Sequence, residues 1–297
     1  MDATDIAFPK LAAKCSADLD RHALAQRLAD LAVSALVDEA MLTPKPGLVD
    51  LRSRGAHKDM NWALMCHSAW SLHPCFYAMA LAGQEIDEQI ILREQIGRIG
   101  REGESAMMRA TGGVNTHRGA IWALGLLVSA AAQDASSTEP NSVAARAGAL
   151  ARLPDRSAPA AIASKGEQAC RKYGVGGARA QAQADFPHIT GIALPRLHRS
   201  RNEGASEDAA RIDALISIIA ELDDTCVLSR GGEQALHSVR TLARAVIDAD
   251  GFAHNAGKRQ LRLLEQDLLE RQVSPGGAAD LLAAALFLDR LQGLEAV

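Results

Sequence analysis

The chain has 297 residues, of which 48% are hydrophobic and only 3% aromatic. This composition favours a core of Ala, Leu, Val and Ile in close-packed helices over a β-sandwich, which uses more β-branched and aromatic residues. The net charge is −4 and no long basic run is present, which argues against binding to nucleic acid or a membrane surface. No apolar stretch approaches the roughly 20 residues that a membrane-spanning helix requires.

The N-terminal residues carry Asp2 and Asp5 where a signal peptide would carry Lys or Arg. The five cysteines are scattered and lack the pairing of a metal site. These features predict free thiols in a reducing, cytoplasmic compartment. We expect residues 1–20 to form a flexible lead-in and residues 21–297 to form one all-α domain.

Apolar residues recur with the 3.6-residue period of an amphipathic helix from His22 to Leu42, and Pro44 ends that helix. A second helix is predicted from a cap at Asp59 or Asn61 to about Leu81, with a kink at residues 73–74. Further helices are predicted at about 86–110, 118–132, 142–152, 158–172, 206–222, 232–249, 254–272 and 275–292. The Gly- and Pro-rich segment 173–204 is predicted to be irregular. The sequence therefore predicts a single-domain bundle of about eight to ten helices.

The loop after the first helix concentrates charge beside two prolines and two glycines. It holds Lys45, Asp50, Arg52, Arg54, His57, Lys58 and Asp59. A helical protein that interrupts itself with this much charge and rigidity is expected to build a functional site there.

Three other junctions offer groups for an anion or a metal. Residues 112–120 place amides, His117 and Arg118 at a helix start, which suits a phosphate but is equally typical of an ordinary glycine stop and cap. Arg179 follows a glycine-rich turn and could clamp a phosphate. Asp223 and Asp224 are predicted at a helix C-terminus, where bound Mg²⁺ or full solvation would relieve their unfavourable charge. Asp280 is predicted near a helix start, a comfortable position for an acid that requires no function.

Several cofactor classes are disfavoured. The sequence has no G-x-x-x-x-G-K-S/T run, no G-x-G-x-x-G turn after a strand, and neither C-x-x-C nor a helical pair of zinc-binding histidines. The remaining acids and cations suit Mg²⁺ and a polyphosphate. A prenyl synthase is disfavoured because the third acid of its D-D-x-x-D motif is missing after Asp224.

Four motifs together resemble one family. They are E-x(4)-P-K-P-G-L-V-D-x(4)-G-A-H-x-D at 39–59, G-V-N-T-H-R-G-A at 113–120, D-T-x-x-L-x-R-G-G at 224–232 and S-P-G-G-x-A-D-L-L at 274–282. In this order they are similar to the triphosphoribosyl-dephospho-CoA synthases. Residues 64–69 and 225–230 look more like the branch that serves malonate decarboxylase than the citrate lyase branch. The chain departs from the family at Ala180 and Gln181, where relatives often carry Gly and Glu.

The resemblance implies an all-helical enzyme that joins ATP to the 2′-hydroxyl of 3′-dephospho-CoA and releases adenine. Its product would be the prosthetic-group precursor of an acyl carrier protein, passed on by a downstream transferase. Because the N-glycosidic bond breaks, one carboxylate would act as general base and another group would protonate adenine.

The expected roles divide the candidate residues into three sets. We expect Asp50 or Asp224 as the base and His117 or His57 as the proton donor. The expected phosphate-binding set is Lys45, Gly113, Asn115, Thr116, Arg118, Arg179, Arg230 and Gly231. The expected Mg²⁺ ligands are Glu39, Asp59 and Asp223.

Two alternatives stay open from the sequence. One is a Mg²⁺-dependent hydrolase like the ADP-ribosyl-glycohydrolases, which would use water in place of the ribose hydroxyl. The other is a non-catalytic assembly factor that binds CoA or the carrier protein. A homodimer formed through an Ala/Leu face is also compatible with the composition.

Overall fold

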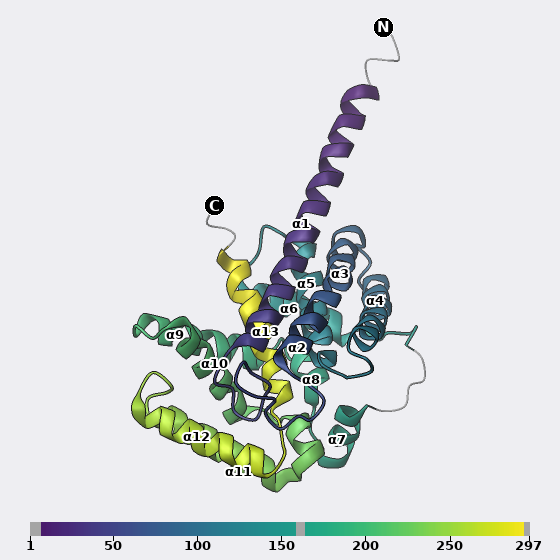
Figure 1. Cartoon of the computed structure of the whole chain (residues 1–297). Helices are drawn as coiled ribbons and strands as arrows, with labels where there is room; N and C mark the ends of the chain where they lie inside the picture. The colour runs from purple at the N-terminus through teal and green to yellow at the C-terminus, as the bar shows by residue number, and fades with distance from the viewer. Residues whose placement is uncertain (1–6, 159–163, 294–297) are drawn as a thin grey trace.

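The computed structural model describes residues 7–158 and 164–293, with side chains from residue 18 onward, and is built from helices (Figure 1). Within these ranges it has no strand, which confirms the all-α prediction. The elements are α1 (Ala7–Met41), α2 (Trp62–Ser71), α3 (His73–Glu85), α4 (Gln89–Ala110), α5 (Arg118–Gln133), α6 (Pro140–Arg152), α7 (Lys165–Tyr173), α8 (Gly177–Gln183), the π-helical turn η1 (Ile189–Ala193), α9 (Leu194–Asn202), α10 (Glu207–Glu221), α11 (Thr225–Asp248), α12 (Asn255–Glu270) and α13 (Gly276–Gln292).

The described residues form more helices than the predicted eight to ten, for two local reasons. The second predicted helix is divided at Leu72, because Pro74 lies in the first turn of α3, where its missing N–H costs nothing. The segment 173–204, predicted to be irregular, instead forms α8, η1 and α9. Several of its glycines and prolines lie at helix ends: Gly174 caps α7 in the left-handed conformation, and Pro195 starts α9.

Two predicted boundaries are corrected. The helix expected from His22 extends back to Ala7, while the division into a lead-in over 1–20 and one domain over 21–297 stays a prediction. The helix expected at 232–249 begins at Thr225 and is kinked at Gly232, whose φ of 69° and ψ of −168° are not helical. Asp224 is therefore the N-cap of α11 and does not lie at a helix C-terminus.

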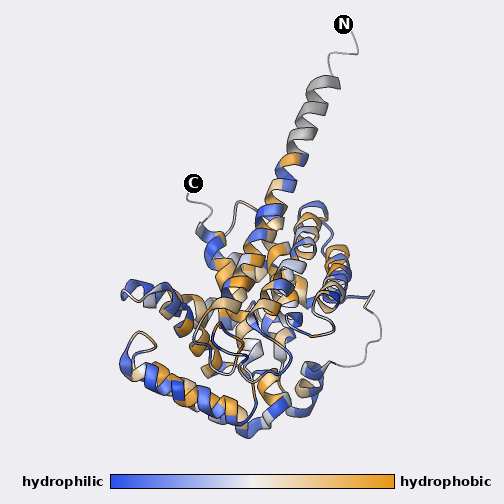
Figure 2. Cartoon of the chain, viewed as in Figure 1, coloured by the Kyte–Doolittle hydropathy of each residue, from blue (hydrophilic) through white to orange (hydrophobic). Residues whose placement is uncertain are grey.

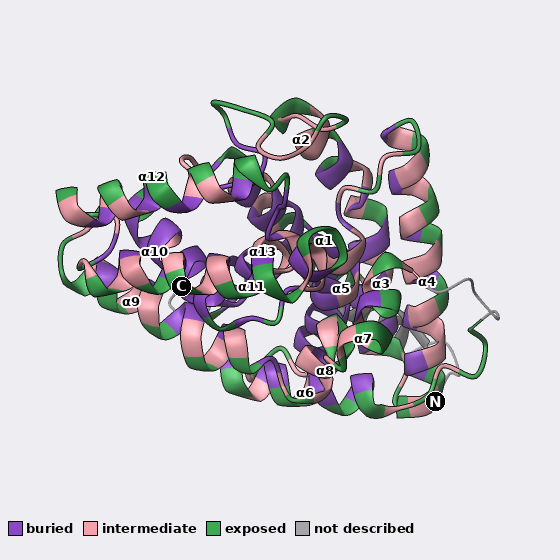
Figure 3. Ribbon diagram, turned by 90° about the horizontal axis from the view of Figure 1, so that it is seen from below, coloured by how far each residue is buried: buried purple, intermediate pink, exposed green. Residues whose placement is uncertain are grey.

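The core lies around α5, α10 and α13, which are buried along most of their length (Figure 3). Helix α5 packs against α3, α6 and α13, and α13 also packs against α1 and α10. Helices α11 and α12 pair with each other at the outside, with hydrophilic residues along their exposed faces (Figure 2). Burial of the apolar faces of these helices supplies the main stabilisation of the fold.

The described helices include none that is both long enough and apolar enough to cross a membrane.

Candidate active site

The loop between α1 and α2 is held together by one buried carboxylate, that of Asp50. Its Oδ1 accepts hydrogen bonds from the backbone N–H groups of Arg52 and Ser53 at 2.8 and 2.9 Å. Its Oδ2 accepts from the Lys45 N–H at 3.1 Å, the Thr43 hydroxyl at 3.0 Å and the Arg52 guanidinium. Burial raises the pKa of Asp50, but these donors outweigh it and the net pKa is lowered. Asp50 is thus an ionised group whose oxygens are fully occupied by the loop.

Lys45 and Glu39 form a buried ion pair at the base of this loop. Lys45 is 2% exposed and Glu39 3% exposed. The Lys45 ammonium donates to the Glu39 carboxylate and, at 2.5 Å, to its backbone carbonyl oxygen. Either charge would be costly if it were buried alone, so each group stabilises the buried, charged form of the other.

His117 is a buried imidazole at the start of α5. Its Nδ1 lies 2.8 Å from the Ser68 hydroxyl, which in turn lies 2.5 Å from the Thr116 hydroxyl. Its Nε2 is buried and has no hydrogen-bond partner among the described residues. Burial, assisted by the positive charge of Lys45, lowers the pKa of His117 to about 3. At neutral pH the ring is therefore uncharged.

Asp224 joins two helices through their first turns. Its Oδ1 accepts from the N–H groups of Cys226 at 2.7 Å and Val227 at 3.4 Å in α11. Its Oδ2 accepts from the N–H of Ala278 at 3.0 Å in α13, a helix whose own N-cap residue, Pro275, makes no capping bond. Burial raises the pKa of Asp224 more than these backbone donors lower it. One side chain thus caps both α11 and α13.

Asp280, in the second turn of α13, reaches the first turn of α5. Its Oδ2 lies so close to Gly119 that a Cβ on that residue would be 2.1 Å away, which explains the glycine. Burial raises the pKa of Asp280 well above its ordinary value; the charges of Glu39 and Asp224 raise it further, and the Ala120 N–H opposes them. Asp280 stays partly exposed. It is a partly exposed carboxyl group whose surroundings stabilise the protonated form.

The N-termini of α5, α11 and α13 therefore converge, linked by Asp224 and Asp280. Side chains already occupy several N–H groups of these ends: Asp224 accepts from Cys226, Val227 and Ala278, and Asp280 accepts from Ala120. The partial positive charge of the three helix ends offsets part of the cost of burying these two acids.

The loop after α1 reaches the same place, because His57 Nε2 lies 3.0 Å from the hydroxyl of Ser274, just before α13. Burial and the nearby charge of Arg230 lower the pKa of His57, and Asp59 opposes them. All four sequence motifs meet at this junction.

Other predicted site residues lie at the margin of the junction or away from it. Gly113, Asn115, Arg230 and Gly231 are exposed, and Thr116 is half-buried beside Ser68. Arg118 starts α5 and pairs with Glu104 of α4 at 2.9 Å. Arg179, on α8, lies near Arg93 of α4.

The three acids predicted to bind Mg²⁺ do not come together. Glu39 is buried against Lys45, Asp59 is exposed beside His57, and Asp223 is exposed and pairs with Arg240 at 2.7 Å. No group of three or more His, Cys, Asp or Glu side chains in the ranges 7–158 and 164–293 is arranged to hold a metal ion. The residues present do not fit a metal site built by the protein alone.

Sequence reasoning assigned no role to Asp280 and did not find Ser68. Both residues belong to segments of the resemblance, and Asp280 lies within S-P-G-G-x-A-D-L-L, which was the available signal. The position of Asp280 within its own helix gives no sign of a role, because its partner lies on a different helix. The side chain in fact caps another helix, α5, next to two further acids.

Comparisons with known proteins agree with this convergence of motifs. Residues 25–296 match the family described as CitG: ATP:dephospho-CoA triphosphoribosyl transferase. This chain belongs to that transferase family. A relative from Azotobacter vinelandii, named probable 2-(5″-triphosphoribosyl)-3′-dephosphocoenzyme-A synthase, is 55% identical over 93% of this chain and 95% of its own length. A Klebsiella pneumoniae protein named as the same synthase is 55% identical over 90% and 95% of the two chains, respectively.

A Pseudomonas putida relative with the same probable name is 57% identical over 91% of this chain and 96% of its own. No solved structure matches the chain. The family resemblance and the enzyme class expected from the four motifs are confirmed. Because family members are transferases, the junction of α5, α11 and α13 is the candidate active site.

Proposed function

We propose that this chain transfers the 5-triphosphoribosyl group of ATP to the 2′-hydroxyl of 3′-dephospho-CoA and releases adenine. Membership of the transferase family supports the overall reaction. The observation that carries the proposal is the meeting of all four motifs where three helix N-termini and the partly exposed Asp280 converge. Such a site places a carboxyl group of raised pKa where all four motifs meet, which is typical of a catalytic acid.

Asp280 is our candidate for the proton transfers. Its carboxylic acid would donate a proton to adenine as the C1′–N9 bond of the ATP ribose breaks. The resulting carboxylate would stabilise the positive charge on C1′ and then accept the proton of the incoming 2′-hydroxyl as the new C1′–O bond forms. The starting acid is restored at the end of each turnover. The raised pKa of Asp280 supports the first step, since burial and the charges of Glu39 and Asp224 stabilise the protonated form.

The residues expected to exchange protons serve positioning roles in this proposal. Asp50 and Asp224 each accept several backbone hydrogen bonds, which leaves little capacity for a base. Burial lowers the pKa of both His117 and His57, so neither imidazole is favoured as a cationic acid at neutral pH. We assign His117 a substrate contact through its unpartnered Nε2.

The triphosphate must be gripped without being activated for cleavage. Arg118 and Arg230, at the margin of the junction, are our candidates for this function. The buried ammonium of Lys45 contributes positive charge to the site, although it donates its hydrogen bond to Glu39. Since the described acids do not build a metal site, we expect any Mg²⁺ to arrive with the phosphates of ATP, held mainly by them and by water.

The proposal also names the enzyme system that uses the product. We assign the product to malonate decarboxylase, with a downstream transferase and an acyl carrier protein as recipients. The two segments that carry this distinction supply Ser68 and Cys226, and both contact groups of the junction. The free thiols of Cys66, Cys75, Cys170 and Cys226 suit a reducing cytoplasm. The homodimer stays a prediction.

Mass spectrometry after incubation with ATP, Mg²⁺ and dephospho-CoA tests the proposal. We expect free adenine and a product heavier than dephospho-CoA by one triphosphoribosyl group. Free ribose triphosphate with unchanged dephospho-CoA would identify a hydrolase instead. An absence of adenine release by folded protein would leave the assembly-factor alternative.

A further inference from the structure

Arg93 of α4 is a buried guanidinium with an incomplete set of partners. The residue is 8% exposed, and its Cζ lies 5.2 Å from the ring centroid of Trp122 on α5. Its Nη1 is 3.7 Å from Asp155 Oδ2, too long for a good hydrogen bond. Its Nε has no hydrogen-bond partner among the described residues. A buried donor without an acceptor is costly, so this arrangement indicates a site for an acceptor from outside the protein.

Two other arginines share the same region. Arg101, two helical turns along α4, takes the closer contact with Asp155, at 2.7 Å. Burial lowers the pKa of Arg93 most; the charges of Arg179 and Arg101 lower it further, and Asp155 raises it. Two guanidinium groups therefore share the Asp155 carboxylate, and the charge of Arg179 acts on one of them. A multivalent anion would relieve this excess of positive charge.

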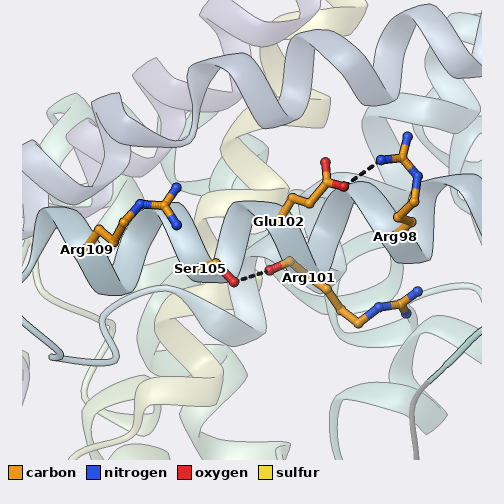
Figure 4. Close-up of a pocket in the computed structure, with 5 residues that line it drawn as sticks. All are labelled: Arg98, Arg101, Glu102, Ser105 and Arg109. Atoms are coloured by element: carbon orange, nitrogen blue, oxygen red, sulfur yellow. Dashed lines mark hydrogen bonds and ion pairs between the residues drawn. The ribbon is translucent and has the colours of Figure 1, made fainter.

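Arg101 also borders a hollow on the surface of α4. The hollow, of about 320 Å³, is lined by Arg98, Arg101, Glu102, Ser105 and Arg109 (Figure 4). Figure 4 shows Arg98 directed to Glu102, whereas Arg101 leaves the helix in another direction. Arg101 thus belongs both to the cluster and to the hollow. Gly97 lies one turn before Arg101, and the Asp155 carboxylate packs directly on it, so a side chain there would obstruct the cluster.

We propose that Arg93, Arg101 and Arg179 form a binding site for a polyphosphate group. Guanidinium groups bind phosphate oxygens through paired hydrogen bonds, and a phosphate would supply the acceptor that Arg93 Nε lacks. Trp122 lies four residues beyond Arg118 in α5, roughly 6 Å along the helix axis at 1.5 Å per residue. The site is therefore one helical turn from the candidate active site.

The source of the polyphosphate follows from the proposed function, on which this part of the inference rests. Either the triphosphate of ATP or the diphosphate of dephospho-CoA has the required chemistry. Binding of the anion itself is independent of the transfer reaction. Failure of the two proposals can therefore be distinguished by separate measurements.

The binding test uses the fluorescence of Trp122. The exposed Trp62 and Trp70 are replaced in a W62F/W70F protein, so that Trp122 is the remaining tryptophan. Titration with inorganic tripolyphosphate should change its emission, because the anion binds beside the guanidinium that covers the ring. Arg101→Gln and Arg179→Gln should each weaken the affinity about tenfold or more, as expected for a lost charged hydrogen bond.

Arg156→Gln is the matched control, since this exposed arginine adjoins Asp155 but pairs with Glu94. It should change the affinity less than about twofold, the range of ordinary surface substitutions. Unchanged affinity in both Arg101→Gln and Arg179→Gln would overturn the site, as would an equal loss in Arg156→Gln. Thermal unfolding of every variant verifies that it is folded.

Repeating the titration with ATP and with dephospho-CoA identifies the source. Weaker binding of ATP alone in the Arg101 and Arg179 variants would assign the site to the triphosphate, and weaker binding of dephospho-CoA alone would assign it to the diphosphate. Either result supports the site. Tripolyphosphate binding by a protein that releases no adenine would refute the proposed function and leave the anion site standing.

Discussion

The loop around Asp50 and the junction around Asp280 shift the pKa of an aspartate in opposite directions. Asp50 is wholly buried, yet backbone amides, a hydroxyl and a guanidinium lower its pKa. Asp280 is partly exposed, yet burial and two neighbouring carboxylates raise its pKa. The two carboxylates differ in their neighbours: donors contact both oxygens of Asp50, whereas Asp280 faces one backbone N–H and the charges of Glu39 and Asp224. The following substitutions test this contrast.

The largest effect is expected for Asp280→Asn. Loss of the proton-exchanging group should reduce adenine release by about 10²- to 10⁴-fold, the usual range for general acid–base catalysis. The free energy of unfolding at pH 7 should change by less than about 1 kcal/mol, because Asn can still accept from Ala120 and carries no charge that repels Glu39. Turnover and urea denaturation measure the two effects.

The matched control is Asp289→Asn on the same helix, where the carboxylate pairs with Arg201 and His198. Its folded fraction should retain normal turnover. Near-normal turnover of Asp280→Asn would remove Asp280 from the chemistry.

Asp50→Ala should give the largest loss of stability in this comparison. The buried N–H groups of Lys45, Arg52 and Ser53 would lose their acceptor, at about 1–3 kcal/mol for each group left unsatisfied, or roughly 3 kcal/mol or more in total. Asp50→Asn, which keeps one acceptor oxygen, should lose less. Urea denaturation measures both. An unchanged unfolding midpoint combined with a large loss of turnover would instead make Asp50 a catalytic group.

His117→Asn should remove a pH dependence of stability. The pKa of His117 is about 3 in the folded protein and about 6.5 when unfolded, so acid protonates the unfolded chain first. The stability is fully present above pH 6.5 and is lost as the pH falls towards 3. Between pH 7 and pH 5 the loss from this residue is about 2 kcal/mol.

Urea denaturation measures the free energy of unfolding of both proteins at pH 7 and at pH 5. The decrease between the two pH values should be about 2 kcal/mol smaller in His117→Asn than in the native protein. Equal decreases in the two proteins would show that the imidazole titrates normally. Ser68→Ala is a useful companion, because it removes the Nδ1 contact and leaves the ring buried.

The smallest effect is expected for Asp223→Asn. This exposed acid makes one surface ion pair with Arg240, so unfolding free energy should change by about 0.5 kcal/mol or less. Adenine release and its dependence on Mg²⁺ concentration should stay within about twofold of the native protein. A tenfold rise in the Mg²⁺ requirement would restore Asp223 as a metal ligand.

Much of the fold could be predicted from the sequence, because helix periods and breaks are local. The expected helices near 86–110, 206–222, 254–272 and 275–292 correspond to α4, α10, α12 and α13 within a few residues. Asn61 caps α2 as one of the two predicted candidates. The glycines of 174–177 misled the prediction, because residues that interrupt one helix can also end it and start the next.

The candidate site was predictable only in part. The motifs located its segments, but burial and partners are tertiary properties. The sequence predicts Lys45 as a free phosphate ligand, whereas the structure pairs it with Glu39. The sequence predicts Asp224 at a helix C-terminus, whereas in the structure it caps the N-termini of two helices. No local pattern could show that Asp280 would reach the start of α5, more than 150 residues earlier in the chain.

The position of α13 in the chain has a consequence for biosynthesis. A nascent polypeptide that has emerged as far as residue 270 already contains α1, α5 and α11, but not the amide that Asp224 caps in α13, nor Asp280 itself. The junction therefore cannot be complete until α13 has been synthesised. Translation products that end before α13 would contain most of the helices but would lack the candidate active site.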